Sequence, residues 1–238
     1  MNVLLISNSY GVDATRYLHR IARADNVEIN TVCLYIGGCS LDKHYRNMYS
    51  EDRAYELYIN GEKSGFFVSM KEALLNRSWD VITFQQASNL SIDYESYQPY
   101  LDSLSEYAKK LCPKAKQLIH QTWCDNADSK RLETLGFSKN SEMFFALEKA
   151  YNKSLENTKV CDIIKSGELI LSLYESGLSP VWRDHEHISY GIGRYAVGLL
   201  WYYKLTGNDI YKNTFSDFDE PIIDAEIEVI KKCIMNIK

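Results

Sequence analysis

The sequence predicts an α/β fold in which helices cover both faces of a mostly parallel β-sheet. Short apolar runs alternate along the chain with amphipathic helical patterns, the order typical of parallel sheets built from strand–helix–strand units. Most of these runs are apolar throughout, as expected for strands buried on both faces. The 238 residues are enough for one sizeable domain of this kind. We therefore expect a single domain over residues 1–238.

The expected strands and helices can be placed in order along the chain. The strands are expected at 3–6, 29–35, 80–84, 117–120 and 160–164. Helical patterns lie at about 17–22, 70–76, 95–111, 143–151, 190–205 and 223–237. The clearest of them is 95–111, whose apolar and aromatic residues share one face and which Cys112-Pro113 ends. Active sites of parallel sheets lie at the carboxyl ends of the strands, so residues that follow these runs are the first candidates for a site.

Two segments depart from this alternation. Residues 49–68 contain two strand-like stretches on either side of Asn60-Gly61, a dipeptide typical of tight hairpin turns. We expect a β-hairpin there that extends over the cleft and is not a separate domain. Residues 124–139 are polar and follow a strand, so they are expected to form a loop at the same edge.

The composition excludes several classes of function. The net charge is −5 and no basic stripe is visible, so we expect no nucleic-acid partner. The six cysteines lack metal-ligand spacing and are expected to be reduced core residues. The amino terminus lacks a signal-peptide pattern, and no apolar run approaches the roughly 18 residues of a membrane span. We therefore expect a cytoplasmic protein without a membrane partner; its oligomeric state is left open.

Two motifs at opposite ends of the chain indicate serine-hydrolase chemistry. Ser9 comes directly after the first apolar run, and Asp184 and His187 form an Asp-x-x-His motif before the helical pattern at 190–205. A serine nucleophile needs a neutral imidazole to take its proton, and a carboxylate holds that imidazole in the right tautomer. His185 is expected to be a bystander. A metal site is not expected, because adjacent residues of one loop point in different directions.

Taken together, these residues resemble the SGNH (GDSL-like) hydrolases, and in particular a little-characterised, largely bacterial branch of them. The resemblance covers essentially the whole chain and implies a flavodoxin-like three-layer α/β/α sandwich with a central, mostly parallel five-stranded sheet. It implies the catalytic triad Ser9, His187 and Asp184. It also implies an oxyanion hole formed by the N–H groups of Ser9 and Gly38 and by a side-chain amide after the third strand.

The chain departs from the family pattern at two of these blocks. The usual Gly-Asp-Ser is Ser7-Asn8-Ser9, and the usual Gly-x-Asn-Asp is replaced by Gln85-Gln86-Ala87-Ser88. Glutamine carries the same amide donor on a longer stem. We expect Gln86 to be the oxyanion donor, with Gln85 as the alternative.

The expected function is a serine esterase that removes a small acyl group, expected to be acetyl, from a small-molecule or carbohydrate ester, without a metal or organic cofactor. Substrate contacts are expected from four further residues near strand ends: Gln85, Gln121, Trp123 and Arg183. The high tyrosine content, 18 Tyr against 8 Phe, suits a cleft for polar ligands. Two alternatives stay open: a lipase- or thioesterase-like hydrolase of longer acyl chains, and a non-catalytic carbohydrate-binding protein.

Overall fold

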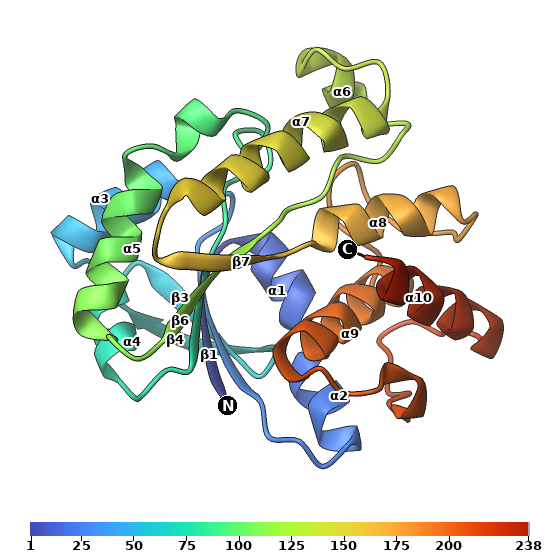
Figure 1. Cartoon of the computed structure of the whole chain (residues 1–238), viewed down its shortest axis with the longest axis horizontal. Coiled ribbons are helices and arrows are strands. Elements are labelled where there is room, and N and C mark those ends of the chain that lie inside the picture. Colours follow the sequence, from blue (N-terminus) through green and yellow to red (C-terminus); the bar gives the residue numbers. More distant parts are fainter. Residues whose placement is uncertain (238) are drawn as a thin grey trace.

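The computed structural model of the chain describes residues 1–237 and is organised around one mixed β-sheet (Figure 1). The strand order across the sheet is β4-β3-β2-β1-β5-β6-β7. The strands are β1 (Asn2–Ser7), β2 (Asn30–Tyr35), β3 (Tyr55–Ile59), β4 (Glu62–Val68), β5 (Val81–Phe84), β6 (Lys116–His120) and β7 (Val160–Ile164). β1, β2, β5, β6 and β7 pair in parallel. These are the five strands expected from the apolar runs, and the predicted sandwich is confirmed.

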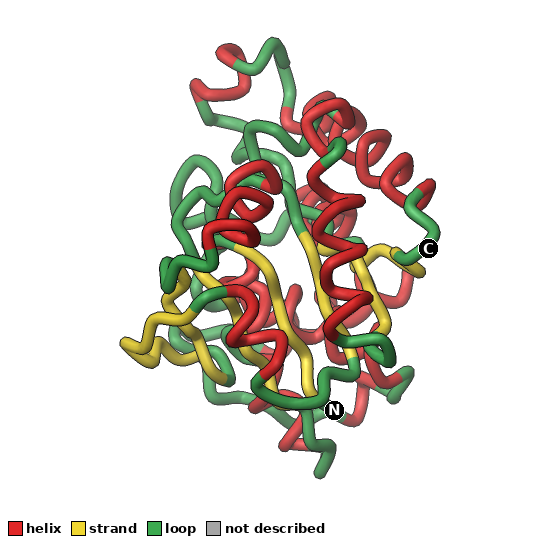
Figure 2. The backbone as a smooth tube through the Cα atoms, turned by 90° about the vertical axis from the view of Figure 1, so that its left-hand side faces the viewer, coloured by secondary structure: helices red, strands yellow, loops and turns green. Residues whose placement is uncertain are grey.

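Helices cover the sheet on both faces, and Figure 2 shows the strands running between them. The helices are α1 (Ser9–Thr15), α2 (Leu18–Ala24), α3 (Leu41–Ser50), α4 (Met70–Leu75), α5 (Tyr100–Leu111), α6 (Lys130–Thr134), α7 (Asn140–Lys153), α8 (Ser166–Glu175), α9 (Ile192–Thr206) and α10 (Asp224–Asn236). One layer has α9 at its centre, in contact with α1, α2, α8 and α10. The other layer contains α3, α4 and α5. None of the helices in residues 1–237 has the length and apolar character needed to cross a membrane.

The hairpin at 49–68 forms, but its predicted place is wrong. Asn60 and Gly61 both have positive φ, 53° and 84°, as a tight hairpin turn requires. β3 pairs antiparallel with β2, and β4 pairs antiparallel with β3. The hairpin thus extends the central sheet to seven strands instead of five, and it does not cross the cleft. Its strands are mostly half-buried or exposed, which is why they lack the apolar runs of the other five.

The helical pattern at 95–111 is divided in two by a proline. A short 3₁₀ turn spans Tyr94–Tyr97, and α5 begins at Tyr100 after Pro99. Gln98 is extended, with φ −105° and ψ 144°, because the residue before a proline is driven out of the helical region. α1, α3, α6 and α8 were not expected as separate helices.

Candidate active site

The candidate nucleophile lies where β1 ends and α1 begins. Asn8 caps the helix, since its side-chain oxygen accepts a hydrogen bond from the Tyr10 N–H at 3.1 Å. Ser9 is therefore the first residue of α1, a position whose N–H has no acceptor within the helix. The Ser9 Oγ lies 3.0 Å from His187 Nε2, within reach for a proton transfer from the hydroxyl to a neutral imidazole.

The Asp-x-x-His motif forms a tight loop that presents the histidine to Ser9. His187 Nδ1 lies 2.9 Å from Asp184 Oδ2, while Asp184 Oδ1 accepts hydrogen bonds from the N–H groups of Glu186 and His187 at 2.8 and 2.7 Å. Partial burial opposes ionisation, but the hydrogen bonds from these N–H groups and from the imidazole outweigh it and lower the pKa of Asp184 to about 2. The carboxylate thus shapes the loop and orients the imidazole, leaving Nε2 free to accept from Ser9.

A cavity of about 320 Å³ opens beside Ser9 and His187. Residues at or just after the ends of three strands, a residue of α6 and the Asp-x-x-His loop line it: Asn8, Ser9, Tyr10, Tyr35, Gly37, Gly38, Ala87, Ser88, Asn89, Arg131, Glu186 and His187. Gly38 has a positive φ of 59° and open space where a Cβ would be. Its N–H donates no backbone hydrogen bond in residues 1–237, so it is free to face a ligand in the cavity.

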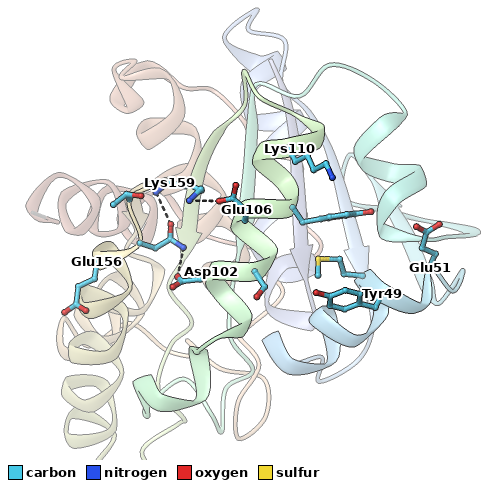
Figure 3. A pocket seen from close by; sticks show the side chains of 12 residues that line it. Tyr49, Glu51, Asp102, Glu106, Lys110, Glu156 and Lys159 are labelled. Carbon is cyan, nitrogen blue, oxygen red and sulfur yellow. Dashed lines mark hydrogen bonds and ion pairs between the residues drawn. The ribbon is translucent and has the colours of Figure 1, made fainter.

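A second, larger cavity of about 800 Å³ lies along α5 and holds none of these residues (Figure 3). Its labelled side chains are mainly charged, and Lys159 pairs with Glu106 at 2.7 Å. No histidine lines this cavity. Of these two cavities, it is the smaller one at the strand ends that contains the Ser9–His187 pair.

The structure contradicts the role expected of Gln86. Its Oε1 accepts from the N–H groups of Leu41 and Ala87, both at 2.9 Å, and its Nε2 donates to the Ser96 carbonyl oxygen and hydroxyl at 2.9 and 3.1 Å. Both ends of this buried amide are used, so it has no N–H to offer an oxyanion. Gln86 instead connects the segment after β5 to the start of α3 and to the 3₁₀ turn at Tyr94–Tyr97.

Gln85 is also buried and does not line the cavity, so neither its expected substrate contact nor its alternative oxyanion role is supported. Its Nε2 donates to Asn8 Oδ1 at 2.6 Å, and its Oε1 accepts from the Ser7 hydroxyl and lies 3.0 Å from His120 Nδ1. Asn8 Nδ2 in turn donates to the Cys39 carbonyl oxygen at 3.0 Å. This buried network fixes the ends of β1, β5 and β6 relative to the glycine turn.

The other three expected substrate contacts are structural. Trp123 is fully buried, packs against Tyr10 with ring centroids 4.3 Å apart, and donates its indole N–H to the Glu186 carbonyl oxygen at 2.7 Å. Gln121 is buried and accepts from the Glu168 N–H at 3.1 Å. Arg183 pairs with Asp13 at 2.9 Å. None of the three lines the cavity.

Asn89, Arg131 and Glu186 line the cavity but were not expected to belong to the site. Asn89 lies just beyond the glutamine pair, Arg131 lies in the polar segment 124–139, and Glu186 lies inside the Asp-x-x-His motif. Only Glu186 could have been expected from the sequence, because a residue between two candidate catalytic residues must lie near the site. Within residues 1–237, no group of three His, Cys, Asp or Glu side chains is placed to hold a metal ion.

Comparisons with known proteins agree with this architecture. A family model described as "Domain of unknown function (DUF4886)" matches residues 2–232. A DUF4886 family protein from Bacteroides uniformis superposes with a TM-score of 0.89 at 29% identity, over 99% of this chain and 93% of that one. A comparison with curated proteins finds no match.

Two more distant structures place the fold among the SGNH hydrolases. A protein from Slackia heliotrinireducens assigned to the SGNH hydrolases has a TM-score of 0.62 at 20% identity, over 86% of this chain and 98% of that one. A family 3 carbohydrate esterase from Clostridium thermocellum has a TM-score of 0.50 at 11% identity, over 86% and 94%. The chain therefore has the SGNH hydrolase fold, and it belongs to the DUF4886 family.

Proposed function

We propose that this protein is a serine esterase in which Ser9 is the nucleophile, His187 the general base and Asp184 the residue that orients the base. The observation that carries the proposal is the continuous chain from Ser9 Oγ to His187 Nε2 at 3.0 Å and from His187 Nδ1 to Asp184 Oδ2 at 2.9 Å. Ser9 attacks the ester carbonyl while His187 takes its proton. His187 then protonates the leaving alcohol, and water hydrolyses the acyl-enzyme in the same way.

The tetrahedral intermediate needs hydrogen-bond donors at the former carbonyl oxygen. We assign this role to the N–H groups of Ser9 and Gly38 and to the side-chain amide of Asn89, which takes the place first expected of Gln86. All three residues line the cavity. A donor of this kind is worth about 2.7–4 kcal/mol in the transition state.

The size and lining of the cavity favour a small acyl group on a polar alcohol. About 320 Å³ is at the lower end of the range for ligand sites, and the lining mixes serine, asparagine, arginine and glutamate with two tyrosines. A long acyl chain would need an extended apolar groove, which these residues do not provide. The distant likeness to a carbohydrate esterase supports a carbohydrate ester as the substrate.

The proposal is tested with p-nitrophenyl acetate and p-nitrophenyl octanoate. We expect the acetate to be hydrolysed with the higher kcat/KM, and Ser9→Ala and His187→Ala to lose this activity. His185→Ala is the matched control: His185 lies two residues from His187, but its side chain does not line the cavity, so this variant should keep the activity. Hydrolysis that survives Ser9→Ala would disprove the proposal. A preference for the octanoate would favour a lipase-like enzyme.

A further inference from the structure

One wall of the active-site cavity is an ionic cluster around Arg131. Its guanidinium binds the fully buried Asp125 through two N–H···O hydrogen bonds, Nε to Oδ2 at 2.7 Å and Nη2 to Oδ1 at 2.5 Å. Nη1 donates to Glu186 Oε2 at 2.7 Å, and Nη2 also donates to the Ser88 hydroxyl. Arg131, Glu186 and Ser88 line the same cavity as Ser9. Asp125 thus holds the arginine in place, and the arginine holds Glu186.

Two groups of the cluster make no hydrogen bond in residues 1–237: one N–H of Arg131 and one carboxylate oxygen of Glu186. A guanidinium has five N–H groups, and four of them make the hydrogen bonds just described, so one N–H on Nη1 is left. Glu186 Oε1 accepts no hydrogen bond from residues 1–237, and His185 Nε2 lies 3.7 Å from it. Glu186 keeps 22% of its side-chain surface exposed, so this oxygen is available to a ligand.

A third polar group of the same cavity is also without a partner. The hydroxyl of Tyr10 is buried and makes no hydrogen bond in the described part of the chain. A buried hydroxyl without a partner is costly, so the cavity wall holds an unsatisfied polar group besides those of Arg131 and Glu186. Sugar hydroxyls both donate and accept, so two neighbouring ones match the free Nη1–H and the free Oε1.

The charge of this wall selects further among polar ligands. Arg131 is the one cationic Lys or Arg side chain among the described residues that line the cavity, and it is paired with two carboxylates, Asp125 and Glu186. The wall therefore carries a net charge of −1, and the ionised Asp184 lies on the same loop as Glu186. A ligand with its own carboxylate or phosphate would be repelled, and an uncharged one would not.

We propose that Glu186 and Arg131 form the subsite for the alcohol part of the ester, where they bind neighbouring hydroxyls of an uncharged sugar and reject sugars that carry an anionic group. This inference rests on the proposed esterase function. It adds a substrate class, neutral acetylated carbohydrates, and assigns their recognition to two named residues.

The test compares two sugars of nearly the same shape, acetylated methyl glucoside and acetylated methyl glucuronide. We expect kcat/KM to favour the neutral glucoside by about tenfold or more at low salt, and the preference to shrink at high salt because screening weakens the repulsion. Glu186→Gln should bring the ratio of the two substrates close to one. Each rate is divided by that variant's own rate on p-nitrophenyl acetate, which removes any general loss of activity. The matched control is Glu133→Gln, an exposed position on α6 outside the cavity, and it should keep the wild-type ratio.

Equal rates on the two sugars, or a ratio that Glu186→Gln leaves unchanged, would overturn the inference while p-nitrophenyl acetate hydrolysis still supported the esterase. If the protein hydrolyses no ester, the subsite is tested by binding alone. Ser9→Ala protein is titrated with methyl glucoside and methyl glucuronide by NMR. Tighter binding of the glucoside would support the subsite, and equal or weaker binding would refute it.

Discussion

Asp13 joins the helix that carries the proposed nucleophile to the loop that carries the proposed base, and its removal is an informative perturbation. Asp13 lies one turn after Ser9 in α1, and its side chain is 1% exposed. Its Oδ2 accepts from Arg183 Nη1 at 2.9 Å, and its Oδ1 accepts from Arg194 Nε at 2.8 Å. The N–H of Arg183 also donates to the His187 carbonyl oxygen at 2.9 Å. One buried carboxylate therefore holds both sides of the Ser9–His187 contact.

Asp13→Asn removes the charge and keeps the size of the side chain. It leaves the partly buried Arg183 guanidinium without its carboxylate and Arg194 with Asp219 alone. Breaking a buried ion pair in this way costs about 3–5 kcal/mol. For a protein of this length, 1 kcal/mol shifts Tm by about 2–4 °C, so we expect Tm to fall by about 6–20 °C. We also expect kcat to fall by about 10²-fold, because a displacement of about 1 Å between reacting groups has that effect.

The free energy of unfolding is measured by urea denaturation, and kcat on p-nitrophenyl acetate at a temperature where both proteins are folded. Asp217→Asn is the matched control: Asp217 also pairs with an arginine, Arg20 at 2.6 Å, but its side chain is 78% exposed. An exposed pair contributes less than about 1 kcal/mol. If Asp13→Asn were no more destabilising than Asp217→Asn, the view of Asp13 as the central link would be wrong.

Three further predictions follow from the site and the core. Asn89→Ala should lower kcat about 10²–10³-fold with little change in KM, because an oxyanion donor acts mainly in the transition state; an unchanged kcat would remove Asn89 from the oxyanion hole. The pKa of Asp184 is about 2, below its ordinary 3.8, so its stabilising effect should be complete above about pH 4 and be lost as the pH falls towards 2; Asp184→Asn should lack this dependence in acid unfolding followed by circular dichroism. Burial lowers the pKa of His44 and His120 to about 3, so the unfolded chain takes up protons below about pH 6.5 and the folded chain does not. As the pH is lowered from 6.5, the free energy of unfolding should therefore fall by up to about 1.4 kcal/mol per pH unit for each histidine. His44→Gln should reduce this slope. A free energy of unfolding that does not change between pH 6.5 and 4 would contradict the prediction.

The fold was largely predictable because the strands that form its centre are buried on both faces. Val3 to Ile6 of β1 are fully buried, and such strands appear in a sequence as continuous apolar runs. The hairpin was recognisable from Asn60-Gly61, but its place was not. Which edge a half-exposed hairpin joins depends on long-range pairing, here Val32 of β2 with Ile59 of β3, and no local pattern encodes it.

The candidate triad was predictable for a different reason: Ser9, Asp184 and His187 lie in short motifs whose chemistry is specific. The amide donor was not, because the direction of a side chain just after a strand depends on how the backbone turns there. Gln86 turns towards Leu41 and Ser96, inside the protein. Trp123 was misplaced for the same reason, since its ring packs beneath the site and not in it.

The central claim is that Ser9 is a nucleophile activated by His187. Reaction with a fluorophosphonate, followed by peptide mass spectrometry, tests it most directly. We expect one adduct, on the peptide that contains Ser9, together with no adduct in Ser9→Ala and a much slower reaction in His187→Ala. A folded wild-type protein that forms no adduct, or one labelled at another serine, would contradict the claim.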